Sequence, residues 1–198
     1  LSLHDALPIW RSLADPALGD LVEPFDPERY NQNATVAENI LFGMPVDRRL
    51  TLESLADHPY MAAVIDKCGL TDSVLKMGLE VAATMTEMFA GLAPGHEFFE
   101  RFSFISAEDL PDYQELLQRA GKDGLAGLAP ADRGRLTSLV FKLVPARHRL
   151  GLFNETLERQ LLLVRRAFAA DLPAELHGSI DFSDPETYTA NASVQDNI

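Results

Sequence analysis

Apolar residues recur at helical spacing in two well-marked segments of this chain. The first, Tyr60–Cys68, starts after Pro59 and stops at Gly69, which suits a short amphipathic helix. Its apolar face consists of Met61, Val64, Ile65 and Cys68. The second, Glu155–Ala170, follows Asn154, a residue type that favours helix N-caps. Its apolar stripe consists of Leu157, Leu161, Val164 and Phe168.

Shorter patterns fill the region between them. Thr71–Met77 predicts a short helix ended by Gly78, and Leu79–Leu92 predicts another. The second of these carries Val81, Met85, Met88 and Phe89. Methionine fills irregular gaps in cores, so we expect this stripe to be buried.

Weaker signals complete the pattern. Ser106–Gly121 and Ala131–Leu139 are expected to be helical, and Thr51–Ala56 to form a helical turn or two. Leu21–Val22 and Ser179–Ile180 are candidate short strands. The fold class predicted is mainly α: an irregular bundle of short helices, with at most short strands near two repeated segments.

One stretch of the sequence occurs almost twice. Asp184–Ile198 aligns without a gap with Asp26–Ile40, and the copies share Asp, Pro, Glu, Tyr, Asn, Ala, Val, Asn and Ile at matching places. Ser193 replaces Thr35, a mild change. The first copy, Phe25–Gly43, continues further than the second. Such repetition indicates a unit with a role of its own.

The repeated unit has the pattern of a capped helix. Thr35 and Glu38 have the spacing of a capping box, in which each side chain bonds the other's backbone N–H. Gly43 suits the left-handed residue that ends a helix, and Asp26–Glu28 reads as a turn around proline. An ordinary capped helix is the simplest interpretation of one copy alone.

The stretch Thr35–Gly43 (TVAENILFG) resembles the segment after the Q-loop in ATP-binding domains of ABC transporters. In that family the segment typically has the sequence (Thr/Ser)-(Ile/Val)-x-(Glu/Asp)-Asn-Ile-x-(Phe/Tyr)-Gly. The matching residues are Thr35, Val36, Glu38, Asn39, Ile40, Phe42 and Gly43, and in the second copy Ser193, Val194, Asp196, Asn197 and Ile198. Cys68–Val74 and Gly78–Leu79 are similar to the family's helical subdomain. The resemblance covers about Tyr30–Glu80 and the last dozen residues.

The resemblance implies a bacterial ABC-type ATPase that couples ATP binding and hydrolysis to transmembrane transport. It implies ATP and Mg as cofactors of the intact protein, and a transmembrane domain and a second nucleotide-binding domain as its partners. It also implies a location at the cytoplasmic face of the inner membrane. In the family, the Q-loop and helical subdomain meet the coupling helices of the membrane domain.

The catalytic motifs of that family are not found in this sequence. There is no G-x-x-x-x-G-K-[ST] phosphate loop, no Leu-Ser-Gly-Gly-Gln signature and no apolar strand ending in Asp-Glu. Gln32 lies too close to Thr35 to serve as the Q-loop glutamine. We therefore assign no catalytic, cofactor-binding or metal-binding residue, and expect ATPase activity only in the intact protein.

The composition limits the kinds of partner that are expected. The formal charge of −13 disfavours binding to nucleic acid or to an anionic membrane surface. No apolar run approaches the roughly 18 residues of a membrane helix, so no membrane insertion is expected. Cys68 is the only cysteine, which suits a reducing compartment.

Four regions are expected along the chain. Residues 1–9 (LSLHDALPI) resemble one reading frame of a sequencing adapter and are treated as non-native, so the chain is interpreted as a metagenomic fragment. Residues 10–92 form the region similar to the ABC helical subdomain and contain the first repeat, 25–43. Residues 93–180 form a helical insertion, and residues 181–198 hold the truncated second repeat.

A few polar clusters are candidates for chemistry. His96 and Glu100 share helical spacing, but two ligands make a poor metal site. A basic run at residues 147–149 suits an anion, or more simply ion pairs with carboxylates. The acidic residues of the Ser106–Gly121 segment read as a solvated face; they are Glu108, Asp109, Asp112 and Glu115.

Two other functions stay open. One is a non-enzymatic helical module for protein–protein interaction, in which the repeats mark two docking elements. The other is an unrelated helical enzyme whose site the sequence does not reveal.

Overall fold

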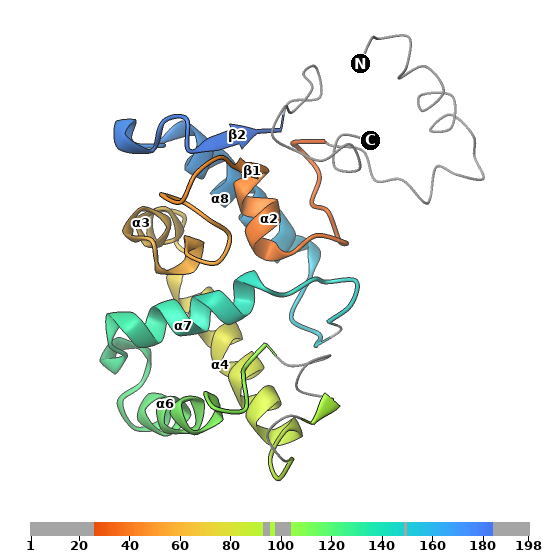
Figure 1. Ribbon diagram of the computed structural model, residues 1–198, viewed down its shortest axis with the longest axis vertical. Coiled ribbons are helices and arrows are strands. Elements are labelled where there is room, and N and C mark those ends of the chain that lie inside the picture. Colours follow the sequence, from red (N-terminus) through yellow and green to blue (C-terminus); the bar gives the residue numbers. More distant parts are fainter. Residues whose placement is uncertain (1–25, 93–95, 98–103, 149, 184–198) are drawn as a thin grey trace, which may run out of the picture.

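A computed structural model describes residues 26–92, 96–97, 104–148 and 150–183. The fold is mainly helical with one two-stranded sheet in this part of the chain, as predicted (Figure 1). Its elements, in order, are α2 (Val36–Leu41), β1 (Gly43–Pro45), η2 (Leu55–Asp57), α3 (Pro59–Lys67), α4 (Thr71–Met88), α6 (Leu110–Asp123), η3 (Leu125–Gly127), α7 (Pro130–Phe141), α8 (Glu155–Ala170), η4 (Ala174–Leu176) and β2 (Ile180–Phe182). The second repeat, Leu21–Val22 and most of the residues between Leu92 and Phe104 lie outside the described residues.

Strands β1 and β2 bring the two ends of the helical body together. They pair antiparallel with Gly43 opposite Phe182. Ser183 N–H donates to Phe42 O at 2.9 Å on one side of the pair, and Val46 N–H to Ser179 O at 2.8 Å on the other. The chain therefore enters the stretch from α3 to α8 and leaves it at one place (Figure 1). The short strand expected near Ser179–Ile180 is confirmed as β2.

The residue that ends α2 is not the predicted one. Phe42, not Gly43, takes the left-handed conformation, with φ 41°. Gly43 instead lies in β1, where a Cβ would be only 2.6 Å from Asp181 O. Glycine is needed there for close approach of the strands, so its role is tertiary and not local.

Helix α4 runs without a break through Gly78, contrary to the predicted stop. A Cβ at Gly78 would lie 2.6 Å from the carbonyl oxygen of Leu136. The glycine thus allows α4 and α7 to cross with their backbones in close contact. Glycine weakens a helix locally, but the packing it permits decides the outcome here.

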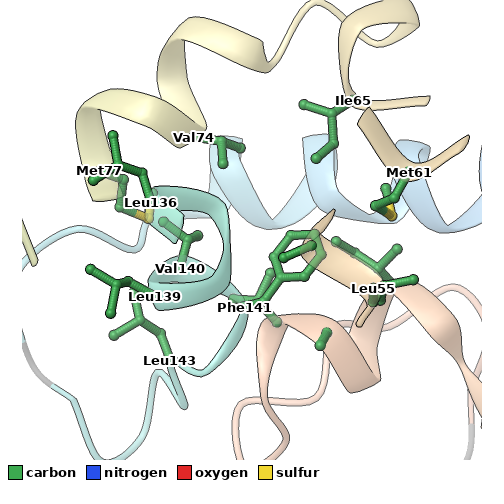
Figure 2. Close-up of a cluster of buried hydrophobic side chains, with 14 of the residues drawn as sticks. Leu55, Met61, Ile65, Val74, Met77, Leu136, Leu139, Val140, Phe141 and Leu143 are labelled. Carbon is green, nitrogen blue, oxygen red and sulfur yellow. The ribbon is translucent and has the colours of Figure 1, made fainter. Parts of the chain in front are cut away.

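The main core lies where α7 meets α3, α4 and η2. Figure 2 shows Phe141 beside Leu55 and Met61, and Leu136 beside Met77. Phe141 and Leu136 are 2% and 0% exposed. Apolar residues from the predicted regions 10–92 and 93–180 therefore share one core.

Helices α3 and α8 form as their patterns predict. Met61, Val64 and Ile65 are buried on α3, and Gly69 follows with φ 69°. On α8 the predicted stripe is buried throughout, and Asn154 Oδ1 accepts from Leu157 N–H at 2.9 Å. Tyr60 Oη donates to Phe168 O at 2.5 Å and so ties α3 to α8.

The end of α4 and the start of α6 differ from expectation. Met85 and Phe89 are buried as predicted, whereas Met88 is 62% exposed, so its predicted place in the core is wrong. Ser106 Oγ accepts from Asp109 N–H at 3.1 Å, but the α-helix begins only at Leu110. It then continues past Gly121 to Asp123.

Candidate functional site

The first repeat is the sequence feature with the strongest functional signal, and its described part is held by a polar network. At its centre the capping box forms as predicted. Thr35 N–H donates to Glu38 Oε2 at 2.7 Å, and Glu38 N–H donates to Thr35 Oγ1 at 3.1 Å. These bonds satisfy N–H groups that a helix start leaves free. Val36 N–H instead donates to Leu143 O at 3.0 Å, which attaches the helix start to the end of α7.

Asn39 fastens the turn before the helix to the helix itself. Its side chain is 3% exposed. Its Nδ2 donates to Asn31 O at 2.9 Å and to Thr35 O at 3.0 Å, while its Oδ1 accepts from Asn31 N–H at 2.8 Å. An amide supplies both donors and an acceptor, which explains why this position suits asparagine.

Arg165 of α8 completes the site and is 5% exposed. Its Nε donates to Asn39 O at 2.6 Å and its Nη2 to Asn39 Oδ1 at 3.0 Å. Its Nη1 donates to Pro27 O at 2.8 Å and to Arg29 O at 3.0 Å. The guanidinium carbon lies 4.3 Å from the centre of the Phe42 ring, a cation–π contact. We call this arrangement the Asn39–Arg165 site.

Burial lowers the pKa of Arg165 to about 10, and the carboxylates of Glu28 and Asp26 oppose that shift. In the described chain no carboxylate forms a salt bridge with Arg165. Backbone carbonyls at the end of a short helix and in a turn replace the usual counter-ion, since a carbonyl cluster also favours positive charge.

Tyr30 and Gln32 lie beside this site. The Tyr30 side chain is 7% exposed, and its ring packs 6.4 Å from that of Phe153. Its hydroxyl is a buried side-chain atom without a hydrogen-bond partner in the described structure. Burial, and then the Glu158 carboxylate, raise the pKa of Tyr30. Gln32 Nε2 donates to Glu158 Oε1 at 2.7 Å, so this glutamine is fixed to α8.

The polar groups of this site are used mainly to attach the first repeat to α8. The described residues around Asn39 and Arg165 offer amides, a guanidinium, a phenol and carbonyls. The donors of Asn39 and most of those of Arg165 are already used within the protein. The network fixes the repeat against α8 by polar contacts to groups that are 126 to 138 residues apart in sequence.

The predicted polar clusters around His96 and His148 are described only in part. His96 is exposed, Glu100 lies outside the described residues, and no set of three or more metal-ligating side chains gathers in the described part. His148 Nδ1 accepts from Val144 N–H at 2.8 Å, and its ring meets Phe104 edge-on at 4.6 Å. Burial lowers the pKa of His148, and its Nδ1 closes a turn; Arg149 lies outside the described residues.

The acidic face of α6 is exposed as predicted, but two ion pairs cross from α6 to α7. Arg135 Nη2 bonds Asp112 Oδ2 at 3.2 Å. Arg119 bonds the nearly buried Asp132 at 3.0 Å. These pairs connect α6 to α7 directly.

Sequence reasoning missed Arg165. A signal was present, because Arg165 lies four residues after Leu161 and next to Val164, at the edge of the apolar stripe. A charged residue in such a place needs a buried polar partner. The sequence alone does not say that the partner is the repeat.

Comparisons with protein families, with curated proteins and with solved structures found no match to this chain. Among the described residues, no helix has the length and apolar character needed to cross a bilayer.

Proposed function

We propose that this chain is a non-catalytic, helical part of the ATP-binding component of an ABC-type transporter. In the intact protein it helps couple ATP binding and hydrolysis to transmembrane transport at the cytoplasmic face of the membrane. ATP, Mg, the transmembrane domain and a second nucleotide-binding domain are the ligands and partners of that larger assembly. The phosphate cradle and magnesium ligands lie in other sequence, because phosphoryl transfer requires both.

The observation that carries the proposal is that each residue type of the ABC-like motif takes a structural role in the first repeat. Thr35 and Glu38 form the cap, Asn39 joins turn to helix, and Gly43 permits strand contact. Val36 and Ile40 are 0% and 1% exposed. Each residue type of the motif thus has a physical task, which favours a complete structural unit over a chance match of short sequence.

The strand pair gives a second line of support. β1 begins at the last residue of the first repeat and β2 ends just before Asp184 in the sequence, and the two strands pair, so the stretch from α3 to α8 begins and ends at one place. A domain whose ends lie close together can be carried within a larger protein without disturbing it. This arrangement suits a helical body held inside a transporter ATPase.

The test is to recover the gene sequence on both sides of this stretch and to compare the intact protein with this chain alone. We expect a phosphate loop upstream of Trp10, and Leu-Phe-Gly or a near variant after Ile198, followed by a signature motif. The purified intact protein should hydrolyse ATP, and this chain alone should not. A reading frame that starts near Trp10 and closes soon after Ile198 contradicts the proposal.

The second candidate is a helical protein–protein interaction module that uses no nucleotide. A half-open groove between α3, α4 and α7 favours it. A gene without a phosphate loop or signature motif, together with binding of a protein partner, would select this function over the first.

A further inference from the structure

A half-open groove with a volume of about 600 Å³ lies between η2, α3, the first turns of α4 and the start of α7. Ala62 of α3 and Ala131 of α7 line it and are exposed, and Ile65 and Val74 are buried residues of its lining. Short side chains on facing helices leave this space open. Its size and mostly apolar lining suit side chains from one turn or two of a partner helix.

Two carboxylates stand at this groove. Asp57 is exposed, and its Oδ1 lies so close to α7 that a Cβ on Gly134 would collide with it. Asp66 accepts one hydrogen bond, from Thr71 Oγ1 at 3.1 Å. Neither aspartate forms an ion pair within the described structure. Both charges therefore face the groove without a cationic partner.

The arginine that lines the groove does not neutralise them. Arg133 Nε donates to Leu128 O at 3.1 Å, and its Nη2 to Leu125 O at 3.3 Å. Its guanidinium is thus bound to carbonyls around η3. The N-terminal ends of α3, α4 and α7 also border the groove.

We propose that this groove binds a short amphipathic helix of a protein partner that carries Lys or Arg beside a small apolar anchor. The apolar anchor enters between Ala62 and Ala131, and the cations pair with Asp57 and Asp66. Charge complementarity selects this occupant over a second copy of the chain, whose net charge is −13. The inference holds for either function proposed above, since it involves no nucleotide.

The test titrates a synthetic Leu/Ala/Lys amphipathic helical peptide into the isotope-labelled full chain and follows amide chemical shifts at low salt. A peptide with Glu in place of every Lys is the matched probe. We expect shifts centred on α3 and α7 beside the groove, with binding at least roughly tenfold tighter for the Lys peptide. Shifts centred elsewhere, or equal binding of both peptides, overturn the proposal.

Variants separate groove binding from general attraction to an acidic protein. The double variant with Asp57→Asn and Asp66→Asn should bind the Lys peptide roughly tenfold more weakly. Glu108→Gln with Asp123→Asn makes the same charge change at exposed positions outside the groove and should have no comparable effect. Ala131→Trp, at an exposed position, should block binding by filling the groove. Equal loss of affinity in the two double variants, or undiminished binding by Ala131→Trp, refutes the site.

Discussion

Arg165 and Asn39 are both buried and joined twice, although they lie 126 residues apart in sequence. Nε of Arg165 bonds the backbone oxygen of Asn39 at 2.6 Å, and Nη2 bonds its side-chain oxygen at 3.0 Å. One side chain on α8 thus fixes both the turn and the helix of the first repeat. Apolar packing alone permits sliding of a helix, whereas these directed bonds define its position.

Replacement of Arg165 by Met should lower the free energy of unfolding by roughly 3 kcal/mol, because several buried oxygens lose their donor. Arg166→Met is the control on the same helix. Arg166 pairs with Glu28 at the surface, where its side chain is 52% exposed, so its loss should cost less than about 1 kcal/mol. Denaturant unfolding measures both. Similar losses for the two variants would contradict a special role for Arg165.

Two helical glycines should respond to alanine in opposite directions. Gly78→Ala places a Cβ 2.6 Å from Leu136 O and should destabilise the protein by about 1–3 kcal/mol. Gly121 lies within α6 and has no atom within 4 Å of an added Cβ. Gly121→Ala should therefore stabilise by roughly 0.5–1 kcal/mol through better helix propensity. Thermal and denaturant unfolding test the pair, and a stabilising Gly78→Ala would refute the close crossing.

Two buried or half-buried tyrosines form a second matched pair. Tyr30→Phe removes a hydroxyl without a partner and should raise the free energy of unfolding by about 1 kcal/mol. Tyr60→Phe removes the bond to Phe168 O and should lower it by about 1 kcal/mol. Urea unfolding near neutral pH distinguishes them. If Tyr30→Phe proves the more harmful, its hydroxyl has a partner after all.

The same tyrosines predict a loss of stability in alkali. Burial raises the pKa of Tyr30, and it raises the pKa of Tyr60 to about 12. Above about pH 10 the unfolded chain loses the phenolic proton while the folded chain keeps it. Stability is therefore fully present below pH 10 and declines as pH rises above it. Tyr30→Phe should flatten this decline in unfolding curves measured from about pH 8 to pH 11, and an unchanged slope would contradict the assignment.

The cap of the first repeat gives a fifth test. Thr35→Ala removes the acceptor for Glu38 N–H and should cost about 1 kcal/mol. Thr35→Ser keeps an acceptor hydroxyl, as Ser193 does in the second copy, and should retain most of the stability. Equal losses would show that the methyl group of Thr35, and not its capping bond, holds this end of α2.

Several features followed from local sequence because local physics creates them. The Thr35–Glu38 capping box joins groups three residues apart, and the Asn154 cap does the same for α8. Helix α3 has its proline at the start and Gly69 with positive φ after its end. The apolar stripe of α8 was predictable since helical periodicity places its residues on one face. The mainly helical fold class follows from the same signals.

Features that depend on distant partners were decided only in the tertiary structure. Gly78 has the local character of a helix breaker, yet its contact with Leu136 makes it part of a continuous helix. Gly43 looks like a helix end, but its strand pairing leaves Phe42 to take the left-handed conformation. The Asn39–Arg165 site joins two segments that no periodicity connects. Sequence patterns describe how each residue interacts with its near neighbours, whereas these outcomes depend on which surfaces meet after the chain has folded.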